Sequence, residues 1–378
     1  MSLGLYLHIP FCAAICNYCN FNRRLFDSAV KDRYVDALLT EVVRAGDGSP
    51  ADTVYFGGGT PSVLHPGEVA ALVEACRRSW TLAPDAEITL EANPETVTAD
   101  ALTGFRAAGV TRLSLGVQSF RDAELGRLAR LHSGATAKKA CWMARDAGVE
   151  NISLDLMMWL PQQSVAQWLE SVDVLIALGP EHASLYLLEV YPNAPLRDDM
   201  ARGNWSVAPE DDAVAMYLSG LDRMDSAGYL QYEISNVSRP GRASRHNLKY
   251  WTDGEWLGFG CGAHSTRGGV RWKNRSAAEE YIAAVAAGAS VVSERRRLSA
   301  GERLEEALFM GLRLKAGVNV ASVRDRYGVD VWDRWGGELE PFVDAGLLSY
   351  DGGSMWMTRS GMLLAHEIMS VFIGETVR

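Results

Sequence analysis

Three cysteines lie within eight residues near the start of the chain, as Cys12, Cys16 and Cys19 in the spacing C-x₃-C-x₂-C. In a chain that shows no export signal, such a cluster indicates metal or redox chemistry rather than disulfides. An iron–sulfur cubane takes thiolate ligands, and its four irons normally need four of them. The spacing therefore predicts a 4Fe-4S cluster held by three cysteines, with one iron open for a substrate or cofactor.

Two other interpretations of these cysteines remain open. A structural zinc site would need a fourth ligand, and His8 is the nearest candidate. The three thiols could also be unligated. The remaining cysteines are far apart among apolar or small residues, so we predict that they are buried small side chains: Cys76, Cys141 and Cys261.

The elements that must position the cysteines alternate between short apolar runs and longer segments of helical period. The predicted strands are Leu3–Ile9, Thr53–Phe56, Glu87–Ala92, Arg112–Val117, Asn151–Met157 and His182–Val190, and the clearest predicted helices are Ser28–Arg44, Gly67–Ser79 and Ala99–Ala108. Strands alternating with helices imply βαβ units and a parallel sheet. Six such units fit before residue 230, so we predict an α/β fold with a partial (β/α)6 barrel rather than a closed eight-stranded one.

Polar or conformationally special residues follow the ends of these strands. The cysteines follow the first strand, Gly57–Pro61 the second, and Gln118 the fourth, while Glu91 ends the third and Asp155 lies within the fifth. In parallel α/β folds the site forms at the carboxyl ends of the strands. These segments are therefore predicted to converge on one site.

The rest of the chain predicts two further parts. Residues 231–295 form a mixed, turn-rich connecting segment after the barrel of residues 1–230. Residues 296–378 are helical and end in a short hairpin with a Gly352–Gly353 turn, which is typical of a winged-helix-like module. Acidic residues within this module, such as Asp325 and Glu338, favour a structural cap over DNA binding.

Composition narrows the class of protein. The net charge is −10 and the sequence pI is about 5.3, which argues against a nucleic-acid partner because phosphate binding needs basic surface. No apolar run is long enough to span a bilayer and no secretory signal is apparent. We expect a cytoplasmic protein whose association with membranes is at most peripheral.

The segment YLHIPFCAAICNYCNF resembles the radical S-adenosylmethionine (SAM) superfamily. Within it, the chain is similar to the oxygen-independent coproporphyrinogen III oxidases and their heme-chaperone (HemW) branch. The resemblance covers nearly the whole chain, through the segments FGGGTPS, EANPETV, RLSLGVQSF, LARLH, LDLMMWLPQQ, SRHNLKYW and GFGCGAHS. It implies a 4Fe-4S cluster whose open iron is chelated by the amino and carboxylate groups of SAM.

The resemblance also assigns residues to SAM. The backbone of Gly57, Gly58, Gly59 and Thr60 would meet the methionine part of SAM, and Arg130 would pair with its carboxylate. Glu91 would hydrogen-bond the cofactor, and Gln118 and Asp155 would surround the ribose. Tyr6 and Tyr18 would lie near the cofactor, with Tyr18 against the adenine. A carboxylate within the apolar run Ile152–Met158 would be costly without a partner, so we expect one for Asp155.

Two features favour the heme-chaperone branch. Phe21 stands where the oxidases carry a further cysteine, and the segment His246–Trp251 matches an H-N-x-x-Y-W motif, whose histidine is a candidate heme ligand. The motif residues expected to meet heme are His246, Asn247, Tyr250 and Trp251. Two residues depart from the pattern: Trp159 replaces a glycine and is expected to fill space at the site, and Asn20 replaces an aspartate.

We therefore expect a chaperone that binds a cluster, SAM and heme or a porphyrin-like molecule, and delivers heme to an acceptor protein. The alternative is an enzyme that uses a reductant such as flavodoxin or ferredoxin to form a 5′-deoxyadenosyl radical. Its reaction would be of the coproporphyrinogen oxidase type, or a methyl transfer or cyclopropanation of a small molecule. A structural or zinc-binding protein is the third interpretation.

Overall fold

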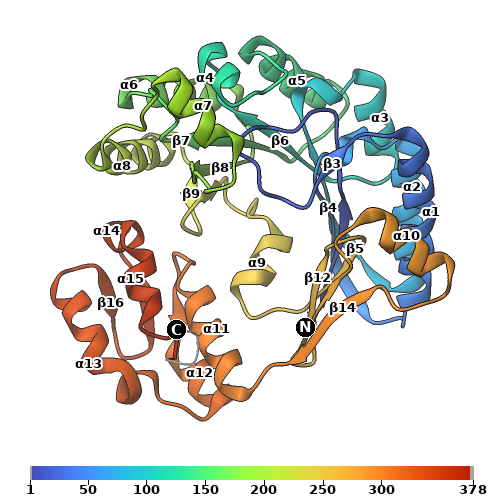
Figure 1. Cartoon of the computed structure of the whole chain (residues 1–378). Coiled ribbons are helices and arrows are strands. Elements are labelled where there is room, and N and C mark those ends of the chain that lie inside the picture. The colour runs from blue at the N-terminus through green and yellow to red at the C-terminus, as the bar shows by residue number, and fades with distance from the viewer. Residues whose placement is uncertain (1, 375–378) are drawn as a thin grey trace.

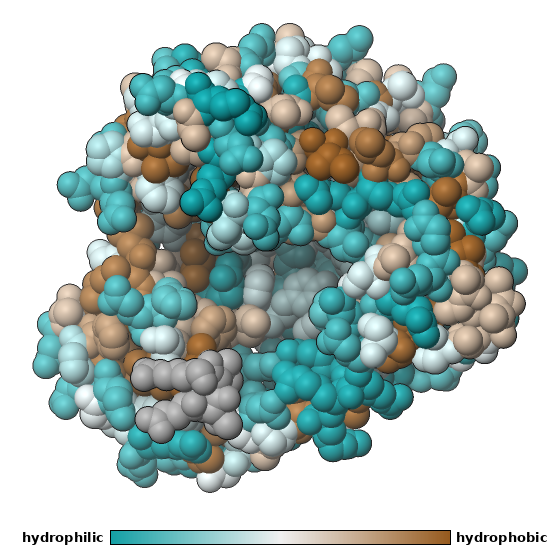
Figure 2. Space-filling model, in the orientation of Figure 1, coloured by the Kyte–Doolittle hydropathy of each residue, from teal (hydrophilic) through white to brown (hydrophobic). Residues whose placement is uncertain are grey.

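A computed structural model describes residues 2–374 of the chain. Its centre is one curved twelve-stranded sheet, with strand order β14-β13-β12-β11-β1-β4-β5-β6-β7-β8-β10-β9 (Figure 1). The space-filling view is hollowed at its centre, inside the curve of this sheet (Figure 2). The sheet does not close, so the barrel is partial, as predicted.

Six parallel strands form the middle of the sheet. They are β1 (Leu3–Ile9), β4 (Pro50–Gly58), β5 (Thr81–Ala92), β6 (Arg112–Gln118), β7 (Ile152–Met158) and β8 (His182–Leu187). All six were predicted from the sequence, although β8 ends at Leu187 rather than at Val190. Alternation along β1 places Leu5, Leu7 and Ile9 in the hydrophobic core, while Tyr6 and His8 lie on the other face of the strand.

Helices connect these strands and cover the outside of the sheet (Figure 1). They are α1 (Ser28–Ala45), α2 (Pro66–Ser79), α3 (Ala99–Ala107), α4 (Asp122–Arg127), α5 (Gly134–Asp146), α6 (Val165–Leu178), α7 (Pro195–Gly203) and α8 (Glu210–Ser226). Side-chain caps mark the start of α1, α2, α3, α5 and α6. Asp27, for example, accepts a 3.0 Å hydrogen bond from the amide of Val30 at the start of α1.

The segment predicted as a connection contributes strands to both ends of the same sheet. Beyond β8 lie β10 and β9, and beyond β1 lie β11 to β14; their bounds are β9 (Leu230–Gln231), β10 (Asn236–Ser238), β11 (Trp256–Phe259), β12 (His264–Arg267), β13 (Val270–Asn274) and β14 (Val292–Arg297). Helix α9 (Arg245–Trp251), which lies between β10 and β11 in the chain, packs against β4, and α10 (Ala278–Ala286), between β13 and β14, packs against α1. The strand β11 is parallel to β1, so the first strand is paired on both edges.

The C-terminal domain has the element order of a winged helix, as predicted. Its elements are α11 (Ala300–Gly311), β15 (Val318–Asn319), α12 (Val320–Tyr327), α13 (Val331–Asp344), β16 (Leu348–Tyr350) and β17 (Ser354–Met357), followed by α14 (Arg359–Leu363) and α15 (Ala365–Ser370). The three short strands pair in the order β15-β17-β16. Helix α11 contacts α9, which joins this domain to the barrel. Within residues 2–374, no helix is both long and apolar enough to cross a bilayer.

Candidate SAM and cluster site

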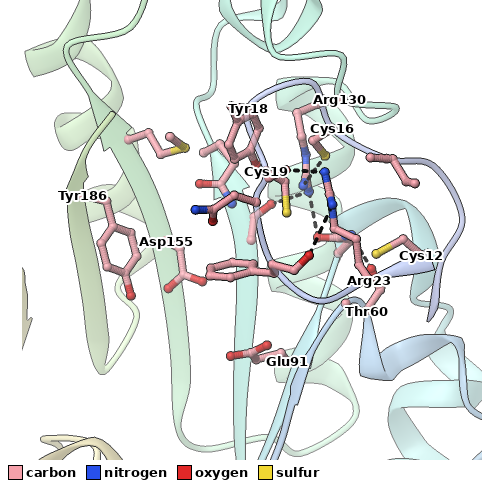
Figure 3. Close-up of a pocket in the computed structure, with 18 of the residues that line it drawn as sticks. Cys12, Cys16, Tyr18, Cys19, Arg23, Thr60, Glu91, Arg130, Asp155 and Tyr186 are labelled. Atoms are coloured by element: carbon pink, nitrogen blue, oxygen red, sulfur yellow. Dashed lines mark hydrogen bonds between the residues drawn. The ribbon is translucent and has the colours of Figure 1, made fainter. Parts of the chain in front are cut away.

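A cavity of about 380 Å³ lies at the carboxyl ends of the parallel strands. Figure 3 shows the thiols of Cys12, Cys16 and Cys19 on one side of it, with Asp155 and Tyr186 on the other. The predicted site residues that line the cavity are Cys12, Cys16, Tyr18, Cys19, Gly58, Gly59, Thr60, Glu91, Gln118, Arg130 and Asp155. Residues from six separate segments of the chain thus meet at one place.

The loop that carries the cysteines is closed by a short parallel pair, β2 (Phe11–Cys12) and β3 (Arg24–Leu25). The amide of Phe26 donates a 2.9 Å hydrogen bond to the carbonyl of Cys12. Within the described part of the chain, no three His, Cys, Asp or Glu side chains are grouped to hold a single metal ion. Three thiols that line one cavity suit a larger cluster, in which each sulfur binds a different iron.

His8 is not available as a zinc ligand in this structure. Its Nε2 lies 2.8 Å from the carbonyl oxygen of Asn22, and its Nδ1 lies 3.1 Å from the hydroxyl of Tyr6. Both ring nitrogens are therefore used inside the protein, and burial lowers the pKa of the imidazole. The zinc interpretation loses its nearest fourth ligand.

The glycine segment after β4 holds the start of the cysteine loop. The amide of Gly59 donates a 2.8 Å bond to the carbonyl of Ile9, and the amide of Thr60 donates one of the same length to Phe11. A Cβ atom on Gly59 would lie 2.8 Å from the Phe11 carbonyl oxygen and 3.0 Å from the sulfur of Cys12. Glycine is needed here because two loops approach closely beside a cluster ligand.

Two partly buried carboxylates, those of Glu91 and Asp155, line the cavity. Glu91 accepts hydrogen bonds from the hydroxyl of Tyr55 at 2.7 Å and from the amide of Gly58 at 3.1 Å. Burial raises the pKa of Glu91 to about 7, and the negative charge of Asp155 contributes to that rise. Burial also raises the pKa of Asp155. The partner expected for this carboxylate is present, because the hydroxyl of Ser114 lies 3.4 Å from its Oδ1. Paired acids of this kind suit a ligand with ammonium and sulfonium charges.

Arg130 is held in place by groups around the cavity. One guanidinium nitrogen donates to the carbonyl of Gly116 at 2.7 Å and to Oδ1 of Asn93 at 2.8 Å, and another lies 3.5 Å from the sulfur of Cys16. Its Nε is buried and has no hydrogen-bond partner within residues 2–374. The guanidinium itself belongs to a residue of the cavity wall, and a planar guanidinium is well suited to bind a carboxylate.

Several residues of the site were not predicted. Asn93 bonds both Arg130 and the hydroxyl of Thr60, and it stands beside a predicted ligand in the segment EANPET, which is the signal that could have found it. Arg23 donates to the carbonyl of Cys19. Tyr186 lies at the mouth of the cavity and is 41 % exposed. Arg23 and Tyr186 lie outside the motifs, so their position at the cavity could be recognised only from the fold.

Two residues at strand ends have left-handed backbones. Gln118 has φ of 67° and lines the cavity, whereas Trp159 has φ of 62° and does not line it. The indole N–H of Trp159 instead donates a 2.7 Å bond to the carbonyl of Ala208. The expectation that this indole fills space at the site was therefore wrong. The left-handed backbone explains why a glycine is usual there, because glycine adopts it without strain.

Two other predicted residues, Tyr6 and Gly57, lie beneath the cavity rather than on its wall. A Cβ atom on Gly57 would meet the rings of Tyr6 and Tyr55 at 2.9 Å. Phe21, in contrast, lies at the mouth of the cavity and is 67 % exposed.

The residues of the H-N-x-x-Y-W motif lie together on α9 but do not line one common cavity. His246 is only 1 % exposed; its Nδ1 lies 2.7 Å from Oγ1 of Thr53, and its Nε2 lies 3.0 Å from the hydroxyl of Tyr250. A role as heme ligand conflicts with this packing, because both ring nitrogens are already used. Tyr250 and Trp251 line a second cavity, and Asn247 lines neither.

Comparison with known proteins agrees with this geometry. Residues 6–175 match the model of the radical SAM superfamily, and residues 298–364 match the HemN C-terminal domain. The heme chaperone HemW of Bacillus subtilis is 35 % identical over 374 residues, which cover 98 % of this chain and 99 % of that one. The chain belongs to the HemW family of radical SAM proteins. HemW of Escherichia coli is 41 % identical over 267 residues, covering 69 % of each chain.

A solved structure matches the fold of this HemW-family chain. Coproporphyrinogen III oxidase (HemN) of Escherichia coli has a TM-score of 0.87, with 22 % identity over 100 % of this chain and 91 % of that one. Membership of the radical SAM superfamily implies a 4Fe-4S cluster and SAM. The cavity fits both groups, because its wall combines three thiols, the carboxylates of Glu91 and Asp155, and the cationic side chain of Arg130.

Proposed function

We propose that this protein is a heme chaperone that binds a 4Fe-4S cluster through Cys12, Cys16 and Cys19, binds SAM in the adjoining cavity, and passes heme to an acceptor protein. The observation that carries the proposal is the similarity to HemW proteins over almost the whole chain. Phe21 supports it, because an exposed phenyl ring at the cavity mouth supplies no further thiol near the cluster.

The residues around the cavity have separate tasks in this proposal. Glu91 and Asp155 meet the positively charged and hydroxyl groups of SAM, and Arg130 meets its carboxylate. The cluster, once bound, supplies an iron with an open position and a route for one electron. Tyr18, which lies between two of the cysteines, packs beside the ligand.

Heme titration and transfer test the chaperone function. Anaerobically purified protein with its cluster is titrated with ferric heme and followed by absorbance, and the loaded protein is then mixed with apomyoglobin. We expect a saturable Soret band at a stoichiometry of about one and its conversion to the spectrum of holomyoglobin. Absence of saturable binding, or heme that stays on the protein when apomyoglobin is in excess, would reject the chaperone function.

A second function is supported by the mouth of the cavity. Tyr186, Leu187 and Tyr191 line it and are partly exposed, which leaves an apolar entrance for a substrate beyond the SAM site. A radical enzyme would use this entrance, with electrons from a flavodoxin or ferredoxin. Incubation with dithionite and SAM should then release 5′-deoxyadenosine in an amount that rises when substrate is added; a heme chaperone without this activity would show no such rise.

A further inference from the structure

A second cavity of about 350 Å³ lies between the barrel and the C-terminal domain. Its walls are formed by the end of α9, by strands β11 to β13 and by α11. Its lining includes Tyr250, Trp256, His264, Arg303, Ala307 and Met310. The cavity is within the size range of small-molecule sites, and it combines an aromatic wall with charged side chains.

Its histidine, His264, differs from the buried His246. The ring of His264 makes no hydrogen bond within residues 2–374 and is accessible to solvent, while its carbonyl accepts a 3.0 Å bond from the indole of Trp256. That bond fixes the backbone from which the ring projects. Burial, followed by the charges of Lys273 and Arg271, lowers the pKa of the imidazole and so favours its neutral form. Neutral imidazole is the form that binds iron.

The aromatic wall of the cavity is rigid. The rings of Tyr250 and Trp256 pack edge to face with their centroids 4.6 Å apart. Behind them, Nε2 of His246 lies 3.0 Å from the hydroxyl of Tyr250, and the two groups share a hydrogen bond. Ala307 and Met310 line the cavity from α11 and add apolar surface and a thioether sulfur. These groups suit a flat, apolar ring system with a metal at its centre.

One of the arginines that line the cavity is able to bind a carboxylate of a ligand. Arg271 makes two hydrogen bonds to Glu306, at 2.7 and 2.8 Å, and Arg326 lies 2.8 Å from Asp253. Arg303 has no carboxylate partner within the described residues; its guanidinium carbon lies 5.8 Å from the ring centre of Tyr327. A propionate of a porphyrin would supply the missing partner.

We infer that this second cavity is the heme site, with His264 as the iron ligand and Arg303 meeting a propionate. The inference rests on the proposed chaperone function and names the place in the fold where that function occurs. In this assignment, His246 holds Tyr250 in the wall of the cavity and does not contact iron.

Heme titrations of anaerobically prepared variants test this assignment. His264→Ala should weaken heme binding at least about tenfold and shift the Soret maximum. His264→Met should restore part of the affinity with a different spectrum, because sulfur also binds heme iron. Arg303→Gln should weaken binding of heme but not of its dimethyl ester. The matched control is His366→Ala, which removes an exposed histidine of α15 and should change nothing.

These experiments distinguish failure of the proposed heme site from failure of the proposed chaperone function. Wild-type protein that fails to bind heme would reject both proposals. Wild-type protein that binds heme, with His264→Ala binding it at unchanged affinity and spectrum, would reject this site alone. If His264→Ala does not fold, as judged by circular dichroism and iron content, Ala307→Trp tests the cavity by filling it. Unchanged heme affinity in a folded Ala307→Trp protein would likewise overturn the assignment.

Discussion

The hydroxyl of Tyr55 donates a 2.7 Å hydrogen bond to Oε1 of Glu91, joining strand β4 to strand β5 beneath the SAM cavity. This bond lowers the pKa of Glu91, whereas burial raises it, and the net value is about 7. Glu91 is therefore largely protonated below pH 7 and ionised above it. Since SAM carries positive charge, we expect its affinity to rise as the pH increases from about 6 to 8.

Tyr55→Phe should move that pH midpoint upward, because the bond that favours the ionised form is lost. At pH 7 we expect SAM to bind a few times more weakly, an effect of about 1 kcal/mol. Anaerobic calorimetry at several pH values would measure both effects. Tyr217→Phe, which removes a buried hydroxyl bonded to the carbonyl of Ile234, serves as the control. A pH profile identical to that of the wild type would show that Glu91 does not face the ligand.

Replacing any one of Cys12, Cys16 and Cys19 with serine should abolish the cluster. Serine is a poor substitute for a thiolate, and two remaining sulfurs leave two irons unligated. Iron and sulfide content after anaerobic reconstitution would measure the loss. Cys141→Ala is the matched control, because Cys141 is fully buried in α5 and far from the cavity. Equal iron in wild type and Cys12→Ser would contradict the ligation.

Trp159→Gly should destabilise the protein by about 1–2 kcal/mol without altering SAM affinity. Glycine relieves the left-handed backbone at φ of 62°, but the packing of the indole and its bond to Ala208 are lost. Urea unfolding would measure the change in the free energy of unfolding. Trp159→Phe separates the two contributions, because it keeps the strained backbone and much of the packing. A large change in SAM affinity for Trp159→Gly would place the indole at the site after all.

His246→Ala should destabilise the protein by about 2–4 kcal/mol, because it opens a buried space and leaves Thr53 and Tyr250 without their partner. Thr53→Val should have a smaller effect of about 1 kcal/mol, since only one bond is removed. Thermal or urea unfolding would give both values. Stability equal to the wild type in His246→Ala would mean that the imidazole does not hold this region together.

The sequence predicted the parallel strands and the residues at their carboxyl ends well. Each strand such as β1 or β6 is a short apolar run, and in a parallel sheet the following residues must share one edge. That rule alone placed Glu91, Gln118 and Asp155 near the cysteines.

What the sequence did not reveal depends on tertiary packing. The indole of Trp159 bonds to a carbonyl 49 residues away, and the burial of His246 follows from how α9 lies against β4. The pairing of β11 with β1 joins residues about 250 positions apart, and no local pattern indicates it. Strand β11 also carries Trp256 into the wall of the second cavity, so local sequence patterns did not indicate that cavity either.

The double pairing of β1 has a consequence for the order of biosynthesis. One edge of β1 meets β4, which emerges soon after it from the ribosome, but the other meets β11, which is made some 250 residues later. Until Trp256–Phe259 appears, the strand that leads into the cysteine loop has an open edge able to pair with other chains. A truncated nascent chain that stops before β11 should therefore aggregate, and final assembly of the cluster loop should follow the synthesis of Trp256–Phe259.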